Sequence, residues 1–65
     1  MGSGFYPQVR EILLHHGCVF RRQGKGSHEI WFSPISNRAF PVAVSLNSRI
    51  LANTILKQAG IDQRL

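Results

Sequence analysis

The sequence predicts a small α+β domain with the element order α-β-β-β-α, in which a three-stranded antiparallel sheet carries two helices on one face. Apolar residues recur at helical spacing near both ends of the chain. Between them lie three short runs of β-branched and aromatic residues, separated by segments rich in glycine, proline and serine. With 65 residues, the chain has room for one domain, over residues 1–65.

The first helix is predicted over residues 7–16. Apolar residues from Val9 to Leu13 recur at helical spacing, and Pro7 occupies a position where the first turn of a helix tolerates proline. Gly17 follows as the residue that commonly ends a helix.

Two strands are predicted over residues 18–22 and 28–32, and the glycine-rich turn of residues 23–27 joins them as a hairpin. The second strand carries a different set of side chains on each face, His28, Ile30 and Phe32 on one and Glu29 and Trp31 on the other. Both sets contain an aromatic residue, so the alternation leaves open which set belongs to the core.

A third strand is predicted over residues 39–44. Phe40, Val42 and Val44 share one of its faces by alternation. Pro41 lacks a backbone N–H group, so this strand is expected at an edge of the sheet.

The last helix is predicted from an N-cap at Asn47 or Ser48 to Gly60, with Ile61 contacting Leu56 in a Schellman motif. Two helices can cover only one face of such a sheet. A large apolar side chain is therefore left on the other face, either as an isolated exposed residue or as part of a contact surface for a partner.

The charge of the chain favours a polyanionic partner. Eight Lys and Arg residues against three Asp and Glu residues give a net charge of +5. Nucleic acid is the favoured partner, ahead of an acidic protein or an anionic membrane surface. No apolar stretch approaches the roughly 18 residues of a membrane span, so no membrane association is predicted. Cys18, the only cysteine, is expected to be a buried thiol, which suits a reducing cytoplasm.

The turn formed by Gly24, Lys25, Gly26 and Ser27 lacks the order of a nucleotide-binding loop, so no cofactor is predicted. Such a turn can bring backbone N–H groups, a hydroxyl and an ammonium group close to one anion, or it can be a flexible hairpin tip. No metal site is predicted either, because the adjacent His15 and His16 would point about 100° apart on a helix.

His28 is the candidate catalytic residue. It follows Gly26 and Ser27 directly, and the hairpin brings the cations of Arg21, Arg22 and Lys25 near it. Histidine changes its charge near neutral pH, so it can take a proton from a ribose 2′-hydroxyl or donate one to the leaving oxygen. Cleavage of RNA is therefore one interpretation, and an ordinary surface histidine is the other.

Three segments of the chain resemble the HicA toxins of bacterial toxin-antitoxin systems. Residues 22–31 read RQGKGSHEIW, residues 40–44 read FPVAV and residues 55–61 read ILKQAGI. Length, basic charge and element order agree with that family. Ala43 is a departure, since members often have proline at this position of the third strand.

The resemblance implies a fold like that of double-stranded-RNA-binding domains and a metal-independent endoribonuclease that cleaves messenger RNA and inhibits growth. It places the catalytic role on His28, and it implies a HicB-type antitoxin as protein partner in the bacterial cytoplasm. Lys25, Arg21 and Arg22 are then expected to bind phosphate, with Gly26 and Ser27 letting the backbone approach it. The alternatives are an RNA-binding module without activity and an adaptor that binds an acidic protein.

Overall fold

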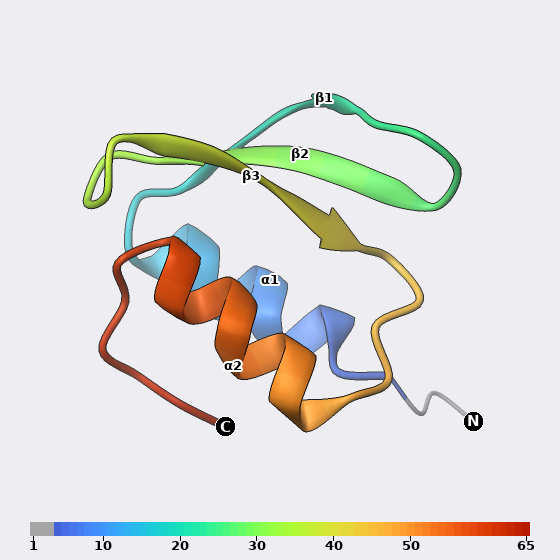
Figure 1. Cartoon of the computed structure of the whole chain (residues 1–65). Coiled ribbons are helices and arrows are strands. Elements are labelled where there is room, and N and C mark those ends of the chain that lie inside the picture. The colour runs from blue at the N-terminus through green and yellow to red at the C-terminus, as the bar shows by residue number, and fades with distance from the viewer. Residues whose placement is uncertain (1–3) are drawn as a thin grey trace.

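The computed structural model describes residues 4–65, so the first three residues of the predicted domain lie outside the described part. Helix, three strands and helix follow one another as the sequence predicts (Figure 1). The elements are α1 (Tyr6–His15), β1 (Val19–Gln23), β2 (His28–Ser33), β3 (Arg38–Ala43) and α2 (Arg49–Gln58). Each therefore lies within a residue or two of its predicted range.

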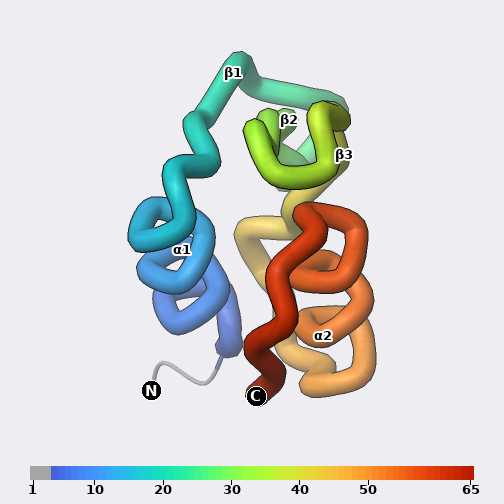
Figure 2. The backbone as a smooth tube through the Cα atoms, turned by 90° about the vertical axis from the view of Figure 1, so that its left-hand side faces the viewer, coloured from blue at the N-terminus to red at the C-terminus, as the bar shows by residue number. Residues whose placement is uncertain are grey.

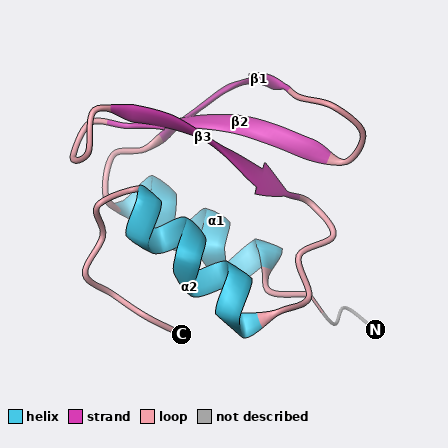
Figure 3. Cartoon of the chain, viewed as in Figure 1, coloured by secondary structure: helices cyan, strands magenta, loops and turns pink. Residues whose placement is uncertain are grey.

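The strands form one antiparallel sheet in the order β1-β2-β3. Both helices pack against the same side of this sheet, as Figures 2 and 3 show. We call the other side the open face. The prediction of two helices on one face is confirmed, and Pro41 lies in an edge strand as expected. This architecture is consistent with a fold like that of double-stranded-RNA-binding domains.

The helix ends follow the local chemistry of the sequence. Ser48 is the N-cap of α2, since its side chain accepts a hydrogen bond from the first turn. Gly60 has a positive φ of 77°, and the N–H group of Ile61 donates to the carbonyl of Leu56 at 3.0 Å, which completes the predicted Schellman motif. Gly17 ends α1 in the same way, with a φ of 86°.

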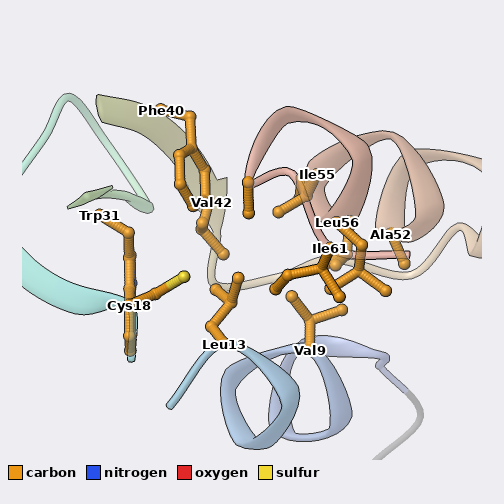
Figure 4. Close-up of a cluster of buried hydrophobic side chains, with 12 residues drawn as sticks. Val9, Leu13, Cys18, Trp31, Phe40, Val42, Ala52, Ile55, Leu56 and Ile61 are labelled. Atoms are coloured by element: carbon orange, nitrogen blue, oxygen red, sulfur yellow. The ribbon is translucent and has the colours of Figure 1, made fainter. Parts of the chain in front are cut away.

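The hydrophobic core lies between the two helices and the covered face of the sheet (Figure 4). Leu13 of α1 and Leu56 of α2 are fully buried there, and Trp31 of β2 is 2% exposed. Cys18 is 1% exposed, so the prediction of a buried thiol is confirmed. Burial of Trp31 also decides which set of β2 side chains faces the core, a choice that the alternation had left open.

The predicted third strand extends one residue too far. Phe40 and Val42 share one face of β3 as predicted, and this face is buried, but Val44 lies in the turn after β3 and is 41% exposed. The chain leaves the sheet at this turn. The N–H group of Val44 donates to the carbonyl of Ser27 at 2.8 Å. Leu46, which is 2% exposed, enters the core in place of Val44.

Ser33 connects the sheet to the end of α2. Its hydroxyl is fully buried, donates to the carbonyl of Ala59 at 2.6 Å and accepts from the N–H group of Ile35 at 3.1 Å. Ser36, three residues later, also has a buried hydroxyl, but within residues 4–65 this oxygen has no hydrogen-bond partner. The two serines therefore differ in what their hydroxyls contribute to stability.

We predict that Ser33→Ala lowers the free energy of unfolding by about 1–3 kcal/mol, because buried partners lose their hydrogen bonds. Ser36→Ala is the matched control. It should leave stability unchanged or raise it slightly, since it removes a buried polar atom that has no partner. Urea denaturation followed by circular dichroism measures both changes. Equal losses in the two variants would contradict this account of Ser33.

Candidate active site

The hairpin between β1 and β2 holds the backbone of His28 in place. Its N–H group donates to the carbonyl of Lys25 at 3.0 Å. Its own carbonyl accepts from the N–H group of Gly24 at 2.9 Å and from the side-chain amide of Gln23 at 3.0 Å. His28 is the first residue of β2, so these bonds attach it to both the strand and the turn.

The imidazole of His28 is exposed, and one of its nitrogens faces the turn. Nδ1 lies 3.3 Å from the carbonyl oxygen of Lys25. Because a carbonyl oxygen can only accept, this hydrogen bond forms when Nδ1 carries the proton. The neutral ring then presents the lone pair of Nε2 to solvent.

The turn beside His28 leaves room next to its backbone. Lys25, Gly26 and Ser27 are all exposed. Gly26 has a φ of 59°, and a β-carbon placed on it would meet no atom within 4 Å. An anion can therefore approach the backbone of this turn, with the ammonium group of Lys25 and the hydroxyl of Ser27 nearby in sequence.

A row of three side chains runs along β2 on the open face. We call His28, Ile30 and Phe32 the β2 row. The register between β2 and β3 is unbroken, so side chains alternate strictly along β2. Since Trp31 points into the core, the β2 row points away from the helices.

Short side chains of β3 flank the β2 row. The residues opposite its three members are Ala43 for His28, Pro41 for Ile30 and Ala39 for Phe32. None of these three side chains is long enough to cover the row. Ala43, the departure from the family pattern, thus lies directly across from the candidate catalytic residue.

On the other flank, the register of β1 shifts between Phe20 and Arg22. Arg22 pairs with Ile30, while the guanidinium of Arg21 lies 4.6 Å from the centroid of the Phe32 ring. The six residues proposed from the sequence therefore form two groups. Lys25, Gly26 and Ser27 lie in the turn next to His28, whereas Arg21 and Arg22 lie farther along the sheet.

The acidic neighbour of His28 in the sequence belongs to the opposite face. Glu29 accepts hydrogen bonds from the hydroxyl of Tyr6 at 2.7 Å and from the indole N–H of Trp31 at 3.0 Å. Burial and, next, the hydrogen bond to Glu29 raise the pKa of Tyr6 above its ordinary value. The carboxylate thus links α1 to β2 beneath the sheet.

The remaining histidines lie in the helical layer. His15 ends α1, and Nδ1 of His16 lies 2.9 Å from the carbonyl oxygen of Ile12. Within residues 4–65, no three His, Cys, Asp or Glu side chains gather closely enough to hold a metal ion. In the same part of the chain, no helix has the length and apolar character needed to cross a membrane.

Two contacts of the candidate site were missed by reasoning from the sequence. Gln23 contributes a side-chain bond to the His28 carbonyl, and Phe32 contacts Arg21 on the open face. The alternation of β2 already grouped Phe32 with His28. The shift in the register of β1 that brings Arg21 over the ring has no signal in the sequence.

The arrangement combines an exposed imidazole, a turn open to anions and a basic sheet face that no element within residues 4–65 covers. It can bind a phosphodiester and take a proton from, or donate one to, an oxygen next to the phosphorus. A protein-family model described as the HicA toxin of bacterial toxin-antitoxin systems matches residues 6–61. Searches of curated proteins and of solved structures found no match.

We predict that Tyr6, the only tyrosine, titrates above the pKa of about 10 that a free tyrosine shows. A raised pKa means that the neutral phenol stabilises the fold fully below pH 10. This stabilisation is lost as the pH rises through the folded-state pKa. Tyrosinate absorbance gives the midpoint, and Glu29→Gln should lower it only partly, because burial remains. A titration midpoint equal to that of the urea-unfolded chain would refute a raised pKa of Tyr6.

Proposed function

Because the chain belongs to the HicA family of bacterial toxin-antitoxin toxins, we propose that it is a metal-independent endoribonuclease that cleaves messenger RNA and thereby inhibits translation. The observation that supports this most is the exposed imidazole of His28, whose Nδ1 lies 3.3 Å from a backbone carbonyl, beside a turn with open space at Gly26. The substrate would be single-stranded RNA, since the open face can admit an extended strand.

The proposed reaction is transfer of the phosphodiester to the neighbouring 2′-oxygen. Nε2 of His28 takes the proton of the 2′-hydroxyl, the 2′-oxygen forms a bond to phosphorus, and the bond from phosphorus to the 5′-oxygen breaks. The leaving oxygen receives a proton from the imidazolium or from water. The products are a 2′,3′-cyclic phosphate and a 5′-hydroxyl end.

The phosphate gains negative charge during the reaction, and we assign the residues of the turn to stabilising it. The ammonium group of Lys25 and the backbone N–H groups of Gly26 and Ser27 would stabilise the extra negative charge as the 2′-oxygen attacks. Arg21 and Arg22 would bind neighbouring phosphates of the same strand. No cofactor enters this scheme.

A HicB-type antitoxin is the proposed protein partner, and the bacterial cytoplasm is the proposed compartment. The family is one of toxin-antitoxin systems. A toxin whose active centre lies on an open sheet face can be neutralised by a protein that covers that face. A domain of this size buries only part of the surface that its unfolded chain exposes, so a protein partner would also stabilise it.

We predict that His28→Ala lowers RNA cleavage about 10²- to 10⁴-fold, the usual loss on removing an acid-base group. Stability should change by less than about 0.5 kcal/mol, because the side chain is exposed. The assay follows end-labelled single-stranded RNA in EDTA and identifies the ends formed.

His16→Ala is the matched control, since it removes an exposed histidine from the helical layer. It should cut like the wild-type protein. Products with 3′-hydroxyl ends would refute the proposed chemistry. Binding of RNA without cutting, by all three proteins, would identify a binding module instead, and tight binding only to an acidic protein would identify an adaptor.

We predict that Lys25→Ala weakens binding to RNA whose 2′-oxygens are methylated and which therefore cannot be cut. The slope of log affinity against log salt concentration should become shallower by about 0.7, the value for one lost phosphate contact on a single strand. Lys57→Ala removes the same charge from the last turn of α2 and should leave the slope unchanged. Fluorescence anisotropy at several salt concentrations measures both slopes; identical slopes for the two variants would argue against a phosphate contact at Lys25.

A further inference from the structure

Phe32 and Arg21 form a contact on the open face, and the proposed function gives Phe32 no role and Arg21 only that of a phosphate ligand. Phe32 is half-buried, and its ring is capped by the Arg21 guanidinium at 4.6 Å from the ring centroid. The cross-strand neighbours of Phe32 are Val19 on β1 and Ala39 on β3. We call Phe32 and Arg21 the stacking pair.

The stacking pair lies on the same line of side chains as His28. Phe32 is four residues along β2 from His28, a separation of about 13 Å in a strand. Only Ile30 stands between them in the β2 row. An extended polymer that runs along β2 would therefore meet the imidazole and the stacking pair in succession.

The charge of the open face selects the kind of polymer. The chain has three acidic residues, of which Glu29 points toward the helices, Glu11 lies in α1 and Asp62 follows α2. Within residues 4–65, no carboxylate side chain therefore belongs to the open face. A polyanion that binds this face is therefore not repelled by a carboxylate.

The edges of the sheet are poorly suited to binding a protein strand. The register shift of β1 interrupts the regular spacing of its backbone groups, and Pro41 removes an N–H group from β3. A ligand of this sheet is thus expected to use its face. Planar groups that stack on an aromatic ring and a guanidinium fit such a face better than a peptide strand.

We propose that the stacking pair binds a base of the RNA strand, at a nucleotide near the one whose 2′-hydroxyl reacts at His28. This inference rests on the proposed function, and it adds a base-binding subsite to it. Bases stack on aromatic side chains and on guanidinium planes with little dependence on sequence. The subsite would position the strand so that the phosphate reaches the turn.

The test compares Phe32→Leu with Phe20→Leu. Both phenylalanines are at least partly exposed, but Phe20 packs edge-on against Trp31, with ring centroids 6.2 Å apart, and so belongs to the covered face. The ligand is a short 2′-O-methyl RNA that carries one 2-aminopurine, whose fluorescence falls when it stacks. Moving the 2-aminopurine along the strand locates the stacked position.

Phe32→Leu should weaken RNA binding about fivefold or more, as expected for loss of one stacked base, and should abolish the fluorescence decrease. Phe20→Leu should bind RNA with the wild-type affinity and should show the same decrease in 2-aminopurine fluorescence as the wild-type protein. Arg21→Gln, at an exposed position, tests the same subsite through the 2-aminopurine fluorescence if Phe32→Leu does not fold, because loss of a phosphate contact alone would weaken binding without abolishing the fluorescence decrease. Arg49→Gln on α2 is its charge-matched control.

Equal RNA binding by the two phenylalanine variants, or by the two arginine variants, would overturn the stacking subsite, and it is the result expected if the pair serves a protein partner instead. If the wild-type protein cuts RNA while the variants bind alike, only the subsite is refuted. If it binds RNA without cutting, the proposed catalysis fails while the variants still decide the subsite. Failure of the wild-type protein to bind RNA refutes both.

Discussion

The burial of Trp31 is the contact on which the surface chemistry of this small domain depends. The indole lies between the sheet and the helices, and its N–H group donates to Glu29. Because neighbouring side chains of a strand point to opposite faces, the register that buries Trp31 also holds His28 on the open face. A slip of one residue would bury the imidazole and expose the indole, so core packing strongly disfavours it.

In this chain of 65 residues, one face of the sheet carries the core and the other carries the candidate site. All of the large fully buried side chains described lie on the helix-covered side, where Leu13, Leu56 and Val42 pack together. The open face contributes little to that core, so it can carry an exposed histidine and several cations at small cost in stability. The proposed antitoxin and the proposed RNA then compete for one surface, which gives a physical basis for neutralisation by a protein that covers this face.

Much of the fold could be predicted from the sequence because its signals are local. Ser48 and Gly60 delimit α2 through their own hydrogen bonds and backbone conformation, and Pro41 indicates an edge strand by lacking a donor. Features that depend on packing could not be predicted. Both faces of β2 carry an aromatic residue, and the position of Arg21 over the Phe32 ring depends on a register shift in β1.

The central claim is that RNA binds the open face with His28 at its end. The most direct measurement is a titration of protein labelled at the isoleucine δ1-methyl groups with 2′-O-methyl RNA, followed by NMR. Ile30 lies in the β2 row, whereas Ile50 is exposed on α2 in the helical layer. If RNA binds the open face, the Ile30 methyl signal shifts strongly and the Ile50 signal does not. A strong shift at Ile50 with none at Ile30 would contradict it.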